Sequence, residues 1–303
     1  MKMMIGPLIV LIVSICVTGQ TCVDNAKEVA PIFSKETQIE YEKALDGARV
    51  LTLVKLGDKY DIENSIWLGR RTAYTGRYKD AIAIFSEAVA RWPNDARLYR
   101  HRGHRYITLR CFDEAIKDFE RATSLVKGKP DEVEPDGLPN AKNIPTSTLQ
   151  SNIFYHLGLA YYLKGDFKKA LKAYENAQKV STNNDMRVAT SYWHYMALRR
   201  MGKKKDAEAI LKPFAGEIEI IENRDYLNLI RLNRGEVTSD ALLTEIGGDA
   251  DTLSSSSLGY GIGNYFLYNG DKPRAMGIFR RITAGNQWAS FGYIAAEVEL
   301  TRR

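Results

Sequence analysis

Residues 62–95 read IENSIWLGRRTAYTGRYKDAIAIFSEAVARWPND, and residues 96–129 read ARLYRHRGHRYITLRCFDEAIKDFERATSLVKGK. Small and aromatic residues recur at the same places in these two stretches. Gly69, Ala81, Phe85 and Ala88 of the first stretch return as Gly103, Ala115, Phe119 and Ala122 of the second, always 34 residues later. A period of this length indicates an array of repeated structural units.

Each unit is predicted to form two helices joined by a short turn. Apolar residues spaced by three and four, such as Ala81, Ile84 and Phe85, indicate one helical face. The turn between the helices is marked by Gly76 in the first unit and by Gly165 in a third copy. We expect the small residues to lie where the two helices cross closely, and the aromatic residue to fill the gap to the next unit.

The repeated motif resembles that of the tetratricopeptide-repeat (TPR) family. The unit Ile62–Asp95 carries, at the spacing of that family, Leu68, Gly69, Gly76, Tyr78, Ala81, Phe85, Ala88 and Pro93. The resemblance implies an all-α TPR helix-turn-helix solenoid with capping helices, because the end units of a solenoid would otherwise expose an apolar face. It also implies a concave surface that binds other proteins or peptides.

The repeats divide the chain into segments. We predict a signal peptide (1–19), an N-terminal segment and capping helix (20–61), repeats one and two (62–129), a proline-rich acidic insert (130–150), repeat three (151–187), three degenerate TPR-like repeats (188–289) and a C-terminal capping helix (290–303). Pro130, Pro135, Pro139 and Pro145 forbid a continuous helix in the insert. Two interpretations of the insert remain open, a surface loop and an arm that binds a partner or covers the groove.

The N-terminus has the pattern of a secretory signal. Lys2 is followed by roughly 15 mostly apolar residues, a run shorter than the roughly 20 that a membrane span needs. Val17 and Gly19 fit a cut before Gln20. We therefore expect export, to the periplasm or outside the cell. Lipid attachment at Cys22, which would tie the protein to the outer membrane, and an uncleaved anchor stay open, as does pairing of Cys22 with Cys111.

Composition excludes several classes of protein. The chain has 303 residues, three of them cysteine, which excludes a disulfide-dense scaffold or a multi-zinc protein. The formal net charge of +6 is too small for this length to indicate a nucleic-acid partner. Serine-hydrolase, zinc-protease and phosphate-loop motifs are missing from the sequence. We therefore expect no enzymatic activity and no cofactor.

Candidate binding residues follow from the TPR resemblance, which implies that certain places of each first helix face the concave groove. These places hold Trp67, Arg70, Arg97, Arg100, His101, His104, Asn152, Tyr155, His156, Tyr192, Arg199, Arg200, Tyr260 and Asn264. Arginine binds carboxylates, and tyrosine and tryptophan are common interface anchors. The predicted function is a scaffold or adaptor with a concave Arg/His/Tyr surface.

Two other functions remain as alternatives. His101, His104 and His156 would share the groove and could serve a metal-dependent hydrolase, although no metal is expected because no cysteine or glutamate of suitable spacing joins them. The protein could also be a purely structural, self-associating subunit.

The C-terminal half resembles a narrower family, the NlpI-type TPR lipoproteins of the bacterial envelope. The resemblance rests on stretches such as LNRGEV (232–237) and GNYFLYNGD (263–271). It implies a homodimer and partners among envelope proteases and cell-wall enzymes.

Overall fold

The computed structural model describes residues 18–54, 57–137, 140–246 and 253–302. Within these ranges it contains fifteen α-helices, one short 3-10 helix and no strand. The α-helices are α1 (Thr18–Asn25), α2 (Lys35–Leu53), α3 (Asp58–Tyr74), α4 (Tyr78–Arg91), α5 (Ala96–Thr108), α6 (Phe112–Val126), α7 (Leu149–Lys164), α8 (Phe167–Val180), α9 (Asn184–Arg200), α10 (Lys204–Leu211), α11 (Arg224–Arg234), α12 (Ser239–Ile246), α13 (Leu253–Tyr268), α14 (Lys272–Ala284) and α15 (Phe291–Thr301). The predicted all-α fold class is confirmed.

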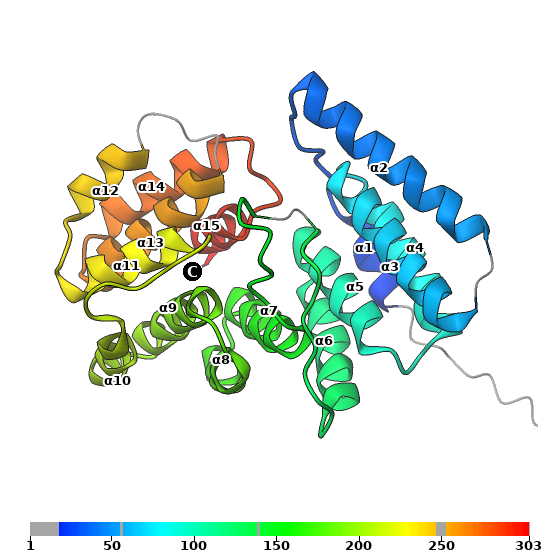
Figure 1. Ribbon diagram of the computed structural model, residues 1–303. Coiled ribbons are helices and arrows are strands. Elements are labelled where there is room, and N and C mark those ends of the chain that lie inside the picture. Colours follow the sequence, from blue (N-terminus) through cyan, green and yellow to red (C-terminus); the bar gives the residue numbers. More distant parts are fainter. Residues whose placement is uncertain (1–17, 55–56, 138–139, 247–252, 303) are drawn as a thin grey trace, which may run out of the picture.

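Successive helices from α3 to α14 form six hairpins that stack side by side into a curved array (Figure 1). The first helices of the hairpins, such as α5 and α7, line the inner side of the curve, and the second helices, such as α8, lie outside it (Figure 1). Helix α2 precedes the array and packs on α3. No described helix is both long and apolar enough to cross a membrane.

The 34-residue register is explained by a contact within each hairpin. A Cβ atom added to Gly69 would lie 2.4 Å from the ring of Phe85, and one added to Gly158 would lie 2.5 Å from the ring of Tyr174. Only glycine leaves room for the ring where the helices cross. The same ring also contacts the next hairpin, because Phe85 stacks on His101 with the ring centroids 5.8 Å apart. The predicted gap-filling role of the aromatic residue is thus confirmed, but the ring packs first against its own glycine.

The hairpin turns need a residue with left-handed backbone conformation. Gly76 supplies it in the first hairpin with φ of 84°, whereas Arg110 adopts φ of 63° in the second. Such a conformation is unfavourable for arginine. The Arg110 side chain is held by an ion pair with Glu297 at 2.7 Å and by stacking over Trp288, 3.9 Å from the ring centroid. This turn therefore ties the second hairpin to the end of the chain.

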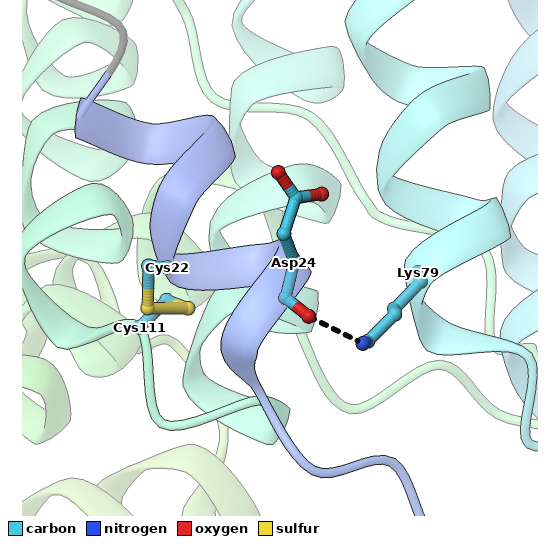
Figure 2. Close-up of a disulfide and its surroundings, with 4 residues drawn as sticks. All are labelled: Cys22, Asp24, Lys79 and Cys111. Carbon is cyan, nitrogen blue, oxygen red and sulfur yellow. Dashed lines mark hydrogen bonds between the residues drawn. A yellow bond between two sulfur atoms is a disulfide. The ribbon is translucent and has the colours of Figure 1, made fainter.

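A disulfide joins Cys22 in α1 to Cys111 at the start of α6, 89 residues away (Figure 2). Lys79 donates a hydrogen bond to the backbone oxygen of Asp24 beside it, at 3.2 Å. A sulfur bound in a disulfide cannot carry a lipid, so the structure argues against the lipid attachment considered for Cys22. The predicted signal peptide (1–19) lies outside the described residues, except for its last two positions at the start of α1.

The proline-rich insert between α6 and α7 runs along the inner side of the array (Figure 1). Glu134 forms an ion pair with Arg100 of α5 at 2.8 Å, and both side chains are buried. Further along the insert, the hydroxyl of Thr146 donates a hydrogen bond to Glu222, which precedes α11. The backbone oxygen of Thr146 accepts a hydrogen bond from the side chain of Asn183 at 2.6 Å. The insert thus bridges the two halves of the array. Of the two interpretations, the structure favours the arm that covers the groove.

The end of the chain also occupies the inner side. Tyr260 of α13 stacks on Trp193 of α9 with ring centroids 5.8 Å apart. Glu299 of α15 pairs with Arg200 of α9 at 2.8 Å. Figure 1 shows α15 inside the curve, beside α7. Helix α15 packs on α13 and α14, as a cap would, but it also fills part of the concave surface.

Candidate ligand-binding cleft

The side chains predicted to share one open surface lie in several different environments. In the second half of the array, Tyr192 and Tyr260 are 1% exposed and Asn264 is fully buried. Arg199 donates to the hydroxyl of Tyr195 at 2.7 Å, while Arg200 is held by Glu299. The expectation of an open groove here was wrong, because α13 packs against α9 and Glu299 of α15 pairs with Arg200 at the end of α9.

The predicted residues of the first hairpins lie beneath or beside the insert. Trp67 stacks with the guanidinium of Arg70, 4.4 Å from the ring centroid. Arg97 pairs with Asp95 at 2.6 Å and with Glu63 at 3.0 Å. These contacts, together with the pairing of Arg100 and Glu134, occupy arginines that were expected to meet a partner's carboxylates. Of these acidic partners, Glu134 comes from the insert, whereas Glu63 belongs to α3 and Asp95 directly precedes α5.

The three groove histidines do lie near one another. The rings of His104 and His156 have centroids 4.8 Å apart, and His156 stacks on Phe119. Burial, followed by nearby arginine charges, holds the pKa of His101, His104 and His156 well below the usual value. All three rings are therefore neutral at pH 7.

The histidines do not form a metal-ligand set. Across the described ranges, the one group of three potential metal-ligating side chains that lie close together is Cys22, Cys111 and Glu114. Two of these are the disulfide cysteines, whose sulfurs are bonded to each other. The geometry consequently offers no support for the metal-dependent hydrolase considered as an alternative.

A cleft of about 530 Å³ lies on the inner side of the array. Its volume is typical of sites that bind small molecules or short peptide segments. It is lined by His104, Asn152, Tyr155, Met186, Ala189, Glu222, Asn223, Asp225, Tyr226, Ser257, Ala289, Ser290 and Phe291. Of the residues predicted from the sequence, His104, Asn152 and Tyr155 lie at this cleft.

The walls of the cleft are fixed by hydrogen bonds. Tyr226 lies between two partners, because its hydroxyl is 3.2 Å from that of Tyr155 and accepts from the indole of Trp193 at 3.1 Å. The buried carboxylate of Asp185 accepts from three successive backbone N–H groups, those of residues 221–223. These bonds hold the segment before α11 in place, so the cleft is preorganised.

The chemistry of the cleft suits binding. Burial raises the pKa of Tyr155 well above its ordinary value, so its hydroxyl stays neutral and can donate or accept a hydrogen bond. Tyr226 and Phe291 contribute aromatic surface to the cleft, and Glu222 and Asp225 contribute carboxylates. A ligand with an apolar body and amide or cationic groups matches such a lining.

Most of the cleft lining was not predicted from the sequence. Glu222 and Tyr226 belong to the degenerate repeats (188–289), and Ala289, Ser290 and Phe291 precede or begin α15. The sequence contained one indication that α15 packs closely on the array, namely Gly292. A Cβ on Gly292 would lie 2.2 Å from the backbone oxygen of Ser256, so this glycine marks the close crossing of α15 and α13.

Comparison with known proteins agrees with the repeat pattern. Two family models, both described as tetratricopeptide repeat, match residues 68–132 and 151–184. The chain contains tetratricopeptide repeats. No curated protein sequence matches the TPR chain. The narrower resemblance to NlpI-type lipoproteins stays a prediction.

Several solved structures are similar to the TPR chain. A crystal structure of MamA is 17% identical in sequence, with a TM-score of 0.43, and the match covers 73% of this chain and 94% of the MamA chain. YrrB, described as a TPR protein with an unusual peptide-binding site, is 14% identical, with a TM-score of 0.41 and coverage of 86% and 97%. A putative kinesin light chain of Podospora anserina is 12% identical, with a TM-score of 0.44 and coverage of 80% and 97%. At this level the similarities carry no information about ligands.

Proposed function

We propose that this TPR protein is a non-catalytic scaffold or adaptor of the bacterial envelope that holds a short segment of a partner protein in the inner cleft. The observation that carries the proposal is the cleft itself. It is the large preorganised opening left on a concave surface that the insert and α15 otherwise fill. Its aromatic and acidic lining favours a segment with apolar and basic side chains.

Location in the envelope is supported by the disulfide. Disulfide bonds persist in oxidising compartments, such as the bacterial periplasm, and are rare in the cytosol. The bond between Cys22 and Cys111 agrees with the secretory pattern at the N-terminus. Envelope proteases and cell-wall enzymes are the partners that the NlpI-type resemblance implies.

The homodimer implied by the same resemblance has a candidate surface on α2. Ile39 is 59% exposed, Val50 61% and Leu53 80%. Exposed apolar groups of this size favour association between protein surfaces. We expect self-association, where it occurs, to use this helix and to leave the cleft open.

Filling the cleft is expected to abolish peptide binding. Ala289 lines the cleft and is only partly buried, so Ala289→Trp would place a large side chain in the opening. A random peptide library displayed on phage is selected on the unmodified protein, and the enriched peptides are then titrated against both proteins by fluorescence anisotropy. We expect at least tenfold weaker binding to the variant.

The matched control is Ala83→Trp, which places the same side chain at an exposed position of α4 on the outer side of the array. This variant should bind the selected peptides as the unmodified protein does. Equal affinity of the Ala289→Trp variant, or failure of the library to yield any binding peptide, would contradict the proposal.

A further inference from the structure

A second, smaller cavity lies between α3 and α5, near the insert. Its volume is about 100 Å³, below that of sites for drug-sized ligands. Three arginines line it, Arg70 from α3 and Arg100 and Arg105 from α5, together with His101 and His104. His104 also borders the large cleft, so the two spaces share this side chain.

The positive charge in this cavity is not balanced. Arg100 pairs with Glu134. Arg70 donates only to neutral groups, the backbone oxygen of Pro135 at 2.9 Å and the hydroxyl of Tyr74 at 3.4 Å. Arg105 has no ion pair with any residue that the structure describes. Of the three guanidinium groups only that of Arg100 forms an ion pair among the described residues, and the nearby carboxylate of Asp136 feels the charge of Arg70, so the cavity keeps an excess of positive charge.

The cavity also contains an unmet hydrogen-bond donor. Arg100 is 7% exposed, and its Nε is buried without a partner. Burial, and to a smaller extent the charges of Arg100 and Arg70, lowers the pKa of Arg105 to about 10, so its side chain is still charged at pH 7. Buried charges and donors of this kind are costly unless a ligand or partner satisfies them.

We propose that this cavity binds a compact tetrahedral oxyanion, phosphate or sulfate. Such an anion would offset the excess positive charge. Planar guanidinium groups match the oxygens of such anions and can donate two bonds each. The small volume admits the anionic group itself and little else. The anion is either a free ion or the end group of a larger molecule that extends past His104 into the cleft.

Titration of the full-length protein with inorganic phosphate tests this assignment. Calorimetry and thermal unfolding are followed with sodium phosphate and sodium sulfate, against sodium chloride at the same ionic strength. We expect saturable binding of one anion per chain and a rise in the melting temperature that chloride does not give. No saturable binding of either anion to the unmodified protein would overturn the proposal, whatever the variants do.

The matched variants are Arg105→Gln in the cavity and Arg280→Gln at an exposed position of α14. Arg105→Gln should weaken phosphate binding at least tenfold, and without phosphate it should unfold at the same or a higher temperature, because it removes a partly buried charge that has no ion pair. Arg280→Gln should change neither property. Equal phosphate affinity of the two variants would contradict the site.

O-phosphoserine is titrated in parallel to find the source of the anion. Tighter binding of O-phosphoserine than of phosphate would support the cavity and assign the anion to a larger molecule. Equal affinities would support it and assign a free ion. Because no peptide is present, this experiment is independent of the test of the large cleft.

Discussion

Replacing Cys22 by alanine is expected to lower the free energy of unfolding by about 4 kcal/mol, with a range of about 2–5 kcal/mol. The disulfide closes a long stretch of chain, since Cys22 and Cys111 are 89 residues apart. Removing the disulfide increases the conformational entropy of the unfolded chain. It also detaches α1, whose Val23 is buried in the core. Chemical denaturation of the oxidised protein and of the variant measures the difference.

Reduction provides the control for this prediction. Dithiothreitol should destabilise the unmodified protein by a similar amount and should leave the Cys22→Ala variant almost unchanged. A double variant, in which Cys111 is also replaced by alanine, should be close in stability to the single variant. A reductant effect of equal size in the variant would show that the bond between these two cysteines does not stabilise the fold.

The second large effect is expected at the glycines of the repeat. Gly158→Ala would place a methyl group 2.5 Å from the ring of Tyr174, which is fully buried. Overpacking of this kind costs about 1–3 kcal/mol, more than alanine gains over glycine in a helix, about 1 kcal/mol. We therefore expect a net loss of up to about 2 kcal/mol, measured as a lower denaturant midpoint.

Gly47→Ala is the matched control because Gly47 is also helical but has nothing within 4 Å of its added Cβ. The same substitution should there stabilise the protein by about 0.5–1 kcal/mol through helix propensity. If the two variants changed stability in the same direction, the close crossing of the helices in each hairpin would not be the reason for the repeated glycine.

The hairpins could be predicted from the sequence because their decisive contacts are local. Gly69 and Phe85 lie in the two helices of one hairpin, and the same contact recurs between Gly103 and Phe119. Because every unit makes the same packing contact, the residues that make it recur at a fixed spacing in the sequence. Helix-packing glycines therefore gave the register, including that of Gly263 in the last hairpin.

The inner surface was harder to predict because it depends on contacts between distant parts of the chain. Arg110 and Glu297 are 187 residues apart, and Arg100 meets Glu134 of an insert that has no repeat partner. Neither contact leaves a periodic signal. The family spacing placed Tyr192 and Tyr260 on the inner side, but the curvature that brings the last helices against α9 buries them.

Amide hydrogen exchange across Phe291–Thr301 tests most directly whether the protein fills its own concave surface. In the structure this helix is held to the middle of the array through Glu297 and Glu299. We expect its amides in the ligand-free protein to exchange as slowly as those of α7, the central inner helix. Exchange as fast as that of an exposed chain terminus would mean that α15 leaves the groove open, and it would contradict the account.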